Sequence, residues 1–364
     1  MAFDAAFEEI PVVDLTDGEP SPAARAEVAD RLRAICHHVG FFQLFGHGLE
    51  PAFFAEHAEA RARFFALSED EKVLVDKTAS PRFRGWERVG AELTNGRPDQ
   101  REQLDLATEN RERGRTAHPP YLRLDGPNQW LPEEVLPGFR SHIGRFSARL
   151  ASVADRVMGL IALGLGLPED HLRTVFGPRP MSLLKLISYP PTPPGDAGVN
   201  PHHDAGFLTL LLQHEVGGLQ VLNGEGHWID VPPTPGAVVV NLGEMLQEMT
   251  GNYVVATTHR VVTGAPRFSS GYFHGPDLTT RLDPLPLADS FAVAVAASER
   301  HRSAGFMARR PRAGAGLETI TVDEGAGVYG QQLWNYYARS YPANMARHHP
   351  DVVSDTEPVS PGSG

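Results

Sequence analysis

The most informative segment of the chain is Asn200-Pro201-His202-His203-Asp204-Ala205-Gly206-Phe207-Leu208-Thr209-Leu210-Leu211-Leu212-Gln213. It places an imidazole and a carboxylate, two metal-ligating groups, directly before an apolar run. Residues two apart on an extended strand point to the same face, so His202 and Asp204 can meet one metal ion while His203 points away. The segment Thr257-Thr258-His259-Arg260-Val261-Val262 offers a third ligand, His259, far downstream. This separation suits two distant strands of one antiparallel barrel.

Two imidazoles and one carboxylate on one face of an octahedron leave three positions open, an arrangement associated with non-heme Fe(II) oxygenases. A His-x-Asp pair alone is a weak signal, because it occurs by chance in many chains. A second signal follows His259: Arg267 and Ser269 share one face of a predicted strand in the run Arg267-Phe268-Ser269-Ser270-Gly271-Tyr272-Phe273. An arginine in an otherwise apolar strand is costly to bury unless it has an anionic partner. A small dicarboxylate would be one, and a structural ion pair with a nearby Asp or Glu is the alternative.

These segments resemble the isopenicillin N synthase-like branch of the 2-oxoglutarate- and Fe(II)-dependent dioxygenases. The resemblance extends upstream and covers roughly residues 8 to 285, with a weaker similarity in the final helix. The segments that carry it are Ile10 to Leu15, Val39 to Gly48, Asn200 to Gln213, Val240 to Gln247, Thr258 to Val262 and Arg267 to Ser269. His203 departs from the small hydroxyl residue that is usual between the ligands, which leaves the ligand set unchanged.

The resemblance implies a fold, a set of cofactors and a reaction. The fold is α+β and mainly β, a double-stranded β-helix (jelly-roll) barrel flanked by helices. Fe(II) is held by His202, Asp204 and His259, and the co-substrate 2-oxoglutarate is anchored by Arg267 and Ser269. With O2, the enzyme oxidises a small molecule, by hydroxylation first and by desaturation or cyclisation as variants, and releases succinate and CO2.

Further residues are candidates for the same site, each with a structural alternative. Tyr189 occupies a position where the family often places a tyrosine near 2-oxoglutarate, although a tyrosine of the barrel wall would look the same. Lys185 shares its strand face and could border a substrate pocket or extend to the rim. Arg84 resembles a pocket segment of relatives, but a turn glycine beside a packing tryptophan explains Arg84-Gly85-Trp86 nearly as well. His274 is as compatible with a structural role as with a functional one.

Composition favours an ordinary globular enzyme. The chain has 364 residues, of which 41% are hydrophobic and 21% charged. Its 33 basic and 45 acidic residues give a net charge of −12, which disfavours nucleic acid and anionic membranes as partners. The single cysteine excludes an internal disulfide, the first residues do not read as an export leader, and no apolar run is long enough to span a bilayer. A cytoplasmic location is expected, and the oligomeric state is left open.

The spacing of apolar residues, and the Gly, Pro and Asn residues between them, predict the organisation of the chain. Helical spacing marks residues 22 to 38, 51 to 66 and 132 to 166, and Ser68 to Glu71 reads as a capping box. From 181 onward, short apolar runs bounded by Gly, Pro or Asn indicate the strands of a barrel or sandwich, among them 183 to 189, 254 to 262 and 268 to 273. The expected units are an N-terminal region 8–130, a backbone helix 131–176, the jelly-roll core 181–285, an insertion and C-terminal helix 286–350, and a disordered tail 351–364. Within the fourth unit, residues 291 to 316 read as a surface excursion or lid.

Three other functions compete with the favoured one. An oxidase of the same fold would use Fe(II) and O2 without 2-oxoglutarate, but Arg267 and Ser269 argue against it. An ethylene-forming relative would fragment 2-oxoglutarate itself, and the segment Phe273-His274-Gly275-Pro276 faintly resembles that group. A binding module that kept the barrel without catalysis is the third, and the intact set of ligands argues against that class.

Overall fold

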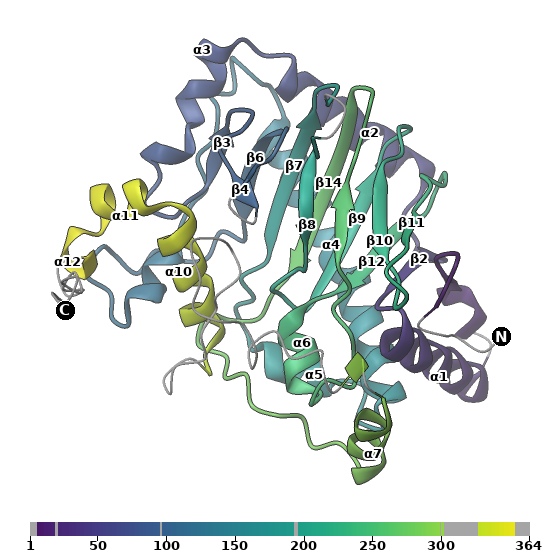
Figure 1. Cartoon of the computed structure of the whole chain (residues 1–364). Coiled ribbons are helices and arrows are strands. Elements are labelled where there is room, and N and C mark those ends of the chain that lie inside the picture. The colour runs from purple at the N-terminus through teal and green to yellow at the C-terminus, as the bar shows by residue number, and fades with distance from the viewer. Residues whose placement is uncertain are drawn as a thin grey trace, which may run out of the picture.

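Two β-sheets form the centre of the molecule, and helices cover one side of the larger sheet (Figure 1). This computed structural model describes residues 6–18, 21–94, 97–192, 196–298, 300–301 and 327–353. The large sheet has eight strands in the order β1-β2-β12-β9-β14-β7-β6-β3, and the small sheet has four in the order β11-β10-β13-β8. Strands from the first half of the chain therefore extend a sheet whose centre is built from the second half.

The large sheet is antiparallel apart from one edge pair, in which β1 runs parallel to β2. Three of its central strands, β7, β9 and β12, are rich in Val, Leu or Ile, and most side chains of these strands and of β14 are buried. The eight strands span Val12–Asp14 (β1), Phe41–Phe45 (β2), Val238–Leu242 (β12), Leu208–Gln213 (β9), Arg267–His274 (β14), Leu183–Tyr189 (β7), Glu102–Ala107 (β6) and Gly85–Glu87 (β3).

The small sheet carries two of the three predicted metal ligands. It consists of Trp228–Asp230 (β11), Leu219–Leu222 (β10), His259–Val261 (β13) and Val199–His202 (β8). His259 lies directly opposite His202 in the β13–β8 register. A separate hairpin of Leu93–Thr94 (β4) and Arg97–Pro98 (β5) lies near β8. The mixed α and β content and the large sheets agree with the expected fold class, and the closure of the sheets into a jelly-roll barrel stays a prediction.

The helices α1 and α4 pack on each other, and α4 packs on strands β9 and β14 of the large sheet. The predicted helix at 132 to 166 begins later, at Phe139, because Pro132, Pro137 and the left-handed Gly138 precede it. The helices are Pro22–His38 (α1), Pro51–Phe65 (α2), Glu69–Lys72 (α3), Phe139–Gly164 (α4), His171–Phe176 (α5), Glu244–Met249 (α6), Asp289–Ala297 (α7), Tyr329–Ser340 (α10), Pro342–His348 (α11) and Pro350–Val353 (α12). None of the described helices combines the length and apolarity that crossing a bilayer requires.

Local sequence signals agree with these elements, with two exceptions. The capping box is confirmed: the Glu71 carboxylate accepts from the Ser68 backbone, and the Ser68 hydroxyl accepts from the Glu71 backbone. The strand predicted at 254 to 262 is wrong in its first half, because ordered pairing begins only at His259. In the predicted excursion, the first residues belong to helix α7, and most of the remainder lies outside the described residues. The tail predicted as disordered from residue 351 is wrong for its first three residues, which belong to helix α12, and its remainder also lies outside the described residues.

The buried Cys36 gives a simple test of the packing of α1. Burial raises the pKa of its thiol to about 12, and its side chain is 1% exposed. Because the thiolate is the reactive form, we expect a thiol-specific disulfide reagent at pH 8 to leave the native protein unmodified. Unfolding in guanidinium should release one reactive thiol per chain, measured by absorbance. Rapid labelling of the native protein would contradict the packing of this helix.

Candidate metal and co-substrate site

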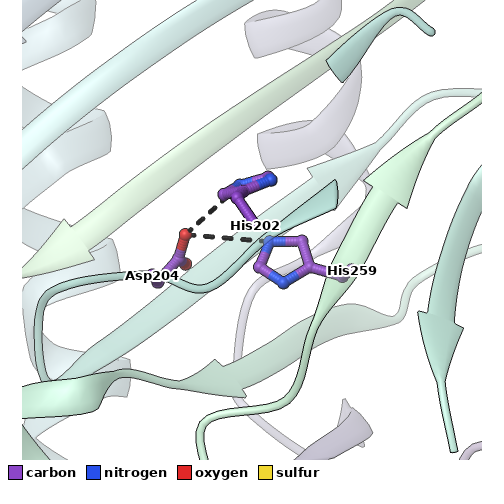
Figure 2. A group of neighbouring side chains, drawn as sticks. All are labelled: His202, Asp204 and His259. Carbon is purple, nitrogen blue, oxygen red and sulfur yellow. Dashed lines mark ion pairs between the residues drawn. The ribbon is translucent and has the colours of Figure 1, made fainter. Parts of the chain in front are cut away.

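His202, Asp204 and His259 lie together, each with one ligand atom directed at a common point (Figure 2). Their candidate ligand atoms all lie within 4.8 Å of one another. The Nε2 atoms of His202 and of His259 are each 3.7 Å from Oδ1 of Asp204, and the two ring centroids are 4.2 Å apart. Two imidazole nitrogens and one carboxylate oxygen suit a divalent transition metal that keeps positions open for other molecules.

Each histidine is oriented by a backbone carbonyl two residues earlier. Nδ1 of His202 lies 2.9 Å from the Asn200 carbonyl oxygen, and Nδ1 of His259 lies 3.1 Å from that of Thr257. A carbonyl only accepts, so Nδ1 must carry the proton and Nε2 is left free for a metal. Both ligands are therefore held in the tautomer that coordination through Nε2 requires.

Asp204 is held from the opposite direction. Its Oδ2 accepts hydrogen bonds from Oγ1 of Thr209 at 2.5 Å and from Nδ2 of Asn241 at 2.6 Å, which leaves Oδ1 facing the histidines. The sequence predicted that Asp204 would lie on the same strand as His202, and this is wrong in detail. Strand β8 ends at His202, and Asp204 lies in the following loop, where its carbonyl accepts from the Glu244 backbone.

The electrostatics of the cluster favour a site that is ready for a metal. Burial, with a further contribution from His259, lowers the pKa of His202 to about 3. Burial alone would raise the pKa of Asp204, but the two histidines and the bonds from Thr209 and Asn241 outweigh it, and the pKa is lowered. At neutral pH, His202 is therefore neutral and Asp204 is ionised. These are the protonation states that metal ligands must adopt.

Arg267 lies at the start of strand β14, and its hydrogen-bond partners are neutral. Its side chain is 1% exposed. Nη1 donates to Oγ of Ser269 at 3.1 Å, and Nη2 donates to Oε1 of Gln213 at 3.2 Å. The guanidinium carbon lies 4.8 Å from the ring centroid of Tyr189. Within the described parts of the chain the Nε of Arg267 has no acceptor and no carboxylate pairs with the guanidinium. The structural ion pair that the sequence left open for Arg267 is therefore not found among the described residues. An anionic ligand remains the expected partner of the buried guanidinium.

A cavity of about 370 Å³ opens beside His202 and Asp204, which is the size range of small-molecule sites. One part of its wall is apolar, with Leu183, Met245, Phe273 and Leu333, and another is ionic or hydroxyl-bearing, with Glu92, Thr94, Arg101, Lys185 and Tyr336. His203 lies on the wall as well, and its Nε2 is 2.8 Å from Oγ1 of Thr258. His203 is thus directed away from the metal cluster but not away from the cavity.

The pocket candidates from the sequence are placed differently from one another. Lys185 lines the cavity. His274 also borders it, although its ring stacks on Phe176 and its Nε2 lies 3.1 Å from Oδ1 of Asp155 on α4. Arg84 does not line it: the buried guanidinium donates to the carbonyls of Leu124 and Gly126, which is a structural role. Tyr189, Ser269 and Arg267 lie together, with the hydroxyls of Tyr189 and Ser269 3.5 Å apart.

Sequence reasoning missed the ionic part of the cavity wall. Glu92, Asp99 and Arg101 belong to the expected N-terminal region 8–130, and all three side chains are buried. A signal was present in Asp99, Arg101, Gln103 and Asp105, polar residues that recur at every second position, which is the period of a strand. That alternation normally marks a solvated face, and only the tertiary structure shows that it is covered.

With this geometry established, comparison with known proteins identifies the class. Residues 173–276 match the model of the 2OG-Fe(II) oxygenase superfamily, and residues 10–133 match the model described as the N-terminal region of non-haem dioxygenase in morphine synthesis. The chain belongs to the 2-oxoglutarate- and Fe(II)-dependent oxygenases, and it is an oxidoreductase of the dioxygenase type. The resemblance stated from the sequence is confirmed.

Three particular relatives indicate how broad this similarity is. A 2-oxoglutarate-dependent dioxygenase of Gibberella zeae is 35% identical over 73% of this chain and 71% of its own length. Homoarginine-6-hydroxylase 2-ODD-C23 of Glycine max is 31% identical over 77% of this chain and 89% of its own. The crystal structure of a full-length Neurospora crassa protein in complex with alpha-KG superposes with a TM-score of 0.69, at 28% identity, over 80% of this chain and 94% of that one.

Proposed function

We propose that this protein hydroxylates a small molecule, with Fe(II) held by His202, Asp204 and His259. The observation that carries the proposal is the convergence of three ligand atoms within 4.8 Å, each side chain fixed by hydrogen bonds on its far side. The donor set suits Fe(II), the metal of the family. When bound, Fe(II) and 2-oxoglutarate supply the oxidising chemistry, in which O2 and 2-oxoglutarate become succinate and CO2 while a substrate C–H bond is hydroxylated.

The co-substrate is anchored by the cluster around Arg267. A guanidinium matches a carboxylate through two parallel hydrogen bonds, and Arg267 is buried with no acidic partner on the described chain. The hydroxyls of Ser269 and Tyr189 are close enough to donate to the same carboxylate. The low polarity around them strengthens such contacts, so this wall selects a molecule with a carboxylate remote from its metal-binding end.

The substrate occupies the cavity beside His202 and Asp204. Its volume of about 370 Å³ accommodates a small molecule, and its mixed lining favours one with an apolar part and a polar or charged part. Leu183, Phe273 and Leu333 would exclude water from the reacting carbon, while the ionic wall would fix the orientation. Amino acids and other compact polar acids or bases are therefore the first class to test, and the homoarginine hydroxylases among the relatives agree with that choice.

A succinate-release screen tests this function. The protein with Fe(II), 2-oxoglutarate and O2 is incubated with panels of amino acids, phenolics and terpenoid acids, and succinate is measured together with a product heavier by one oxygen atom. We expect one panel to raise succinate formation well above the rate without substrate, and anaerobic controls to stay at background. An absence of succinate with every panel, at full iron loading, would contradict the proposal.

The same assay separates the alternatives that the sequence raised. An oxidase that does not use 2-oxoglutarate would consume O2 in its absence, whereas the buried Arg267, whose Nε has no acceptor within the described chain, favours dependence on that compound. Fragmentation of 2-oxoglutarate would yield ethylene in the headspace, and a binding module would consume neither reagent. Each outcome gives a different combination of succinate, gas and O2 uptake.

A further inference from the structure

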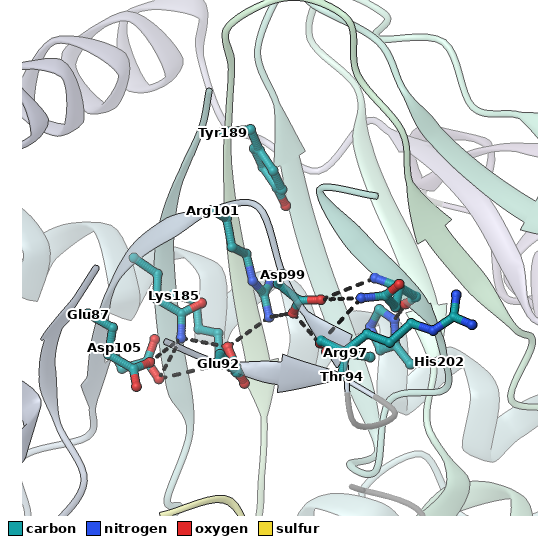
Figure 3. A network of polar contacts seen from close by, with 12 residues as sticks. Glu87, Glu92, Thr94, Arg97, Asp99, Arg101, Asp105, Lys185, Tyr189 and His202 are labelled. Carbon is teal, nitrogen blue, oxygen red and sulfur yellow. Dashed lines mark hydrogen bonds and ion pairs between the residues drawn. The ribbon is translucent and has the colours of Figure 1, made fainter. Parts of the chain in front are cut away.

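We propose that Asp99 and Arg101 are positioning residues, which hold the metal ligand His202 and connect it to the ionic wall of the substrate cavity and to helix α10. This inference rests on the proposed function, because it assigns His202 to the metal. Its basis is a continuous line of buried polar contacts, drawn in part in Figure 3. We call this line, Tyr336-Glu92-Arg101-Asp99-Asn200, the relay.

The first step runs from Asp99 to the metal ligand. Oδ1 of Asp99 accepts from the backbone N–H of Asn200 at 3.2 Å and from its side-chain Nδ2 at 3.1 Å. The carbonyl of Asn200 in turn accepts from Nδ1 of His202 at 2.9 Å. Asp99 is fully buried, and its two hydrogen bonds to Asn200 hold the backbone carbonyl that orients the His202 imidazole. Outer contacts of this kind set the direction and basicity of a metal-bound histidine.

The second step joins Asp99 to the cavity wall through one cation. Nη2 of Arg101 lies 3.0 Å from Oδ2 of Asp99 and 2.7 Å from Oε2 of Glu92. Two buried carboxylates would repel each other, and one guanidinium between them offsets that repulsion. Thr94 donates to the same Oδ2 of Asp99 at 2.7 Å. The position of Asp99 therefore depends on Arg101, and through it on Glu92.

Glu92 gathers contacts from several elements. It accepts from Nζ of Lys185 on β7 at 3.1 Å, from Nε2 of Gln103 on β6 at 2.7 Å and from the hydroxyl of Tyr336 on α10 at 3.0 Å. Glu92, Arg101, Lys185 and Tyr336 all line the cavity. A substrate that contacts this wall would therefore contact the same groups that hold His202. Helix α10, through Tyr336, would thus contribute to the position of His202 on strand β8.

The second histidine ligand, His259, is supported by different residues from those that support His202. The carbonyl that orients His259 belongs to Thr257, whose hydroxyl donates to the Val39 carbonyl at 2.6 Å. Val39 follows helix α1 and belongs to the apolar core, not to the cavity wall. The two ligands thus have separate supports, and the relay predicts that changes in the cavity wall alter His202 and leave His259 as it was.

The test uses Co(II) in place of Fe(II) and the variant Asp99→Asn. The amide is of similar size but carries no charge to attract Arg101, so we expect Co(II) affinity to fall by about 10- to 100-fold. In the proton spectrum of the Co(II) protein, two exchangeable signals should come from the ring N–H groups of His202 and His259. Asp99→Asn should shift or broaden the His202 signal alone, and Thr257→Ala should affect the His259 signal alone.

Glu87→Gln is the matched control, because Glu87 is a buried carboxylate of the same network that contacts Lys77 and Gln103 but neither Asp99 nor Arg101. It should leave both signals and the Co(II) affinity unchanged. If Asp99→Asn does not fold, Asn200→Ala, which removes one bond to Asp99 and keeps the carbonyl, should weaken Co(II) binding in the same direction. Unchanged signals and affinity in a folded relay variant would overturn the proposal. Full Co(II) binding by His202→Ala would instead overturn the metal site itself.

Discussion

Replacing Asp204 with alanine is expected to abolish succinate formation. The substitution removes the carboxylate of the cluster and leaves two imidazole ligands, which supply no negative charge to a divalent ion. The loss of turnover should exceed the roughly 10- to 100-fold that removal of an outer-sphere partner costs. Metal content after dialysis should fall in parallel, so the two measurements together identify the cause as loss of the ion.

The adjacent His203→Ala is the matched control for that experiment. His203 neighbours the ligands in sequence, but it bonds to Thr258 and lies outside the cluster of ligand atoms. Its removal should leave metal content unchanged, and any kinetic effect should appear in the kinetic constants for the prime substrate. Retention of metal by Asp204→Ala together with loss of metal in His203→Ala would mean that the ligand assignment is wrong.

Arg267→Ala should mainly raise the KM for 2-oxoglutarate. Truncating one partner of a buried, hydrogen-bonded charge pair costs about 2–5 kcal/mol. At about 1.4 kcal/mol for each tenfold change, this corresponds to roughly a 30-fold to several-thousand-fold increase. Steady-state rates of succinate formation at varied 2-oxoglutarate measure it directly. Arg267→Lys should recover part of the loss, since it keeps the charge but not the paired geometry.

Arg260→Ala separates this effect from the general loss of an arginine. Arg260 lies on β13, bonds to Gln220 and stacks on Trp228, away from the Arg267 cluster. Its removal should leave the KM for 2-oxoglutarate unchanged. A KM for 2-oxoglutarate that is the same in Arg267→Ala and in the unmodified protein would place the co-substrate elsewhere.

The sequence predicted those parts of the site whose signal is local or periodic. The two-residue period brought Arg267 and Ser269 to one face of β14, and the structure gives a hydrogen bond between their side chains. The apolar runs at 183 to 189 and 268 to 273 correspond closely to strands β7 and β14. These patterns reflect burial on one face of a sheet, which leaves a direct record in the order of residues.

The remaining features depend on contacts between distant segments. Asp204 leaves the strand because its loop must meet Glu244, Thr209 and Asn241, and nothing near Asp204 in sequence signals that. The relay depends on Tyr336, which is far from Glu92 along the chain. Charged residues in strand β6 resemble a solvated face until their partners are known, which are Lys72 for Glu102 and Lys77 for Asp105. Such pairings are decided by tertiary packing and by charge balance in a buried network.

A crystal structure of the protein with Zn(II), a redox-inert stand-in, and 2-oxoglutarate would examine the metal site and the co-substrate site together. We expect one ion about 2.0–2.2 Å from Nε2 of His202, Nε2 of His259 and Oδ1 of Asp204. We also expect the keto acid on that ion, with its remote carboxylate paired to the guanidinium of Arg267. An ion bound by other residues, or a keto acid whose remote carboxylate does not reach Arg267, would contradict these assignments.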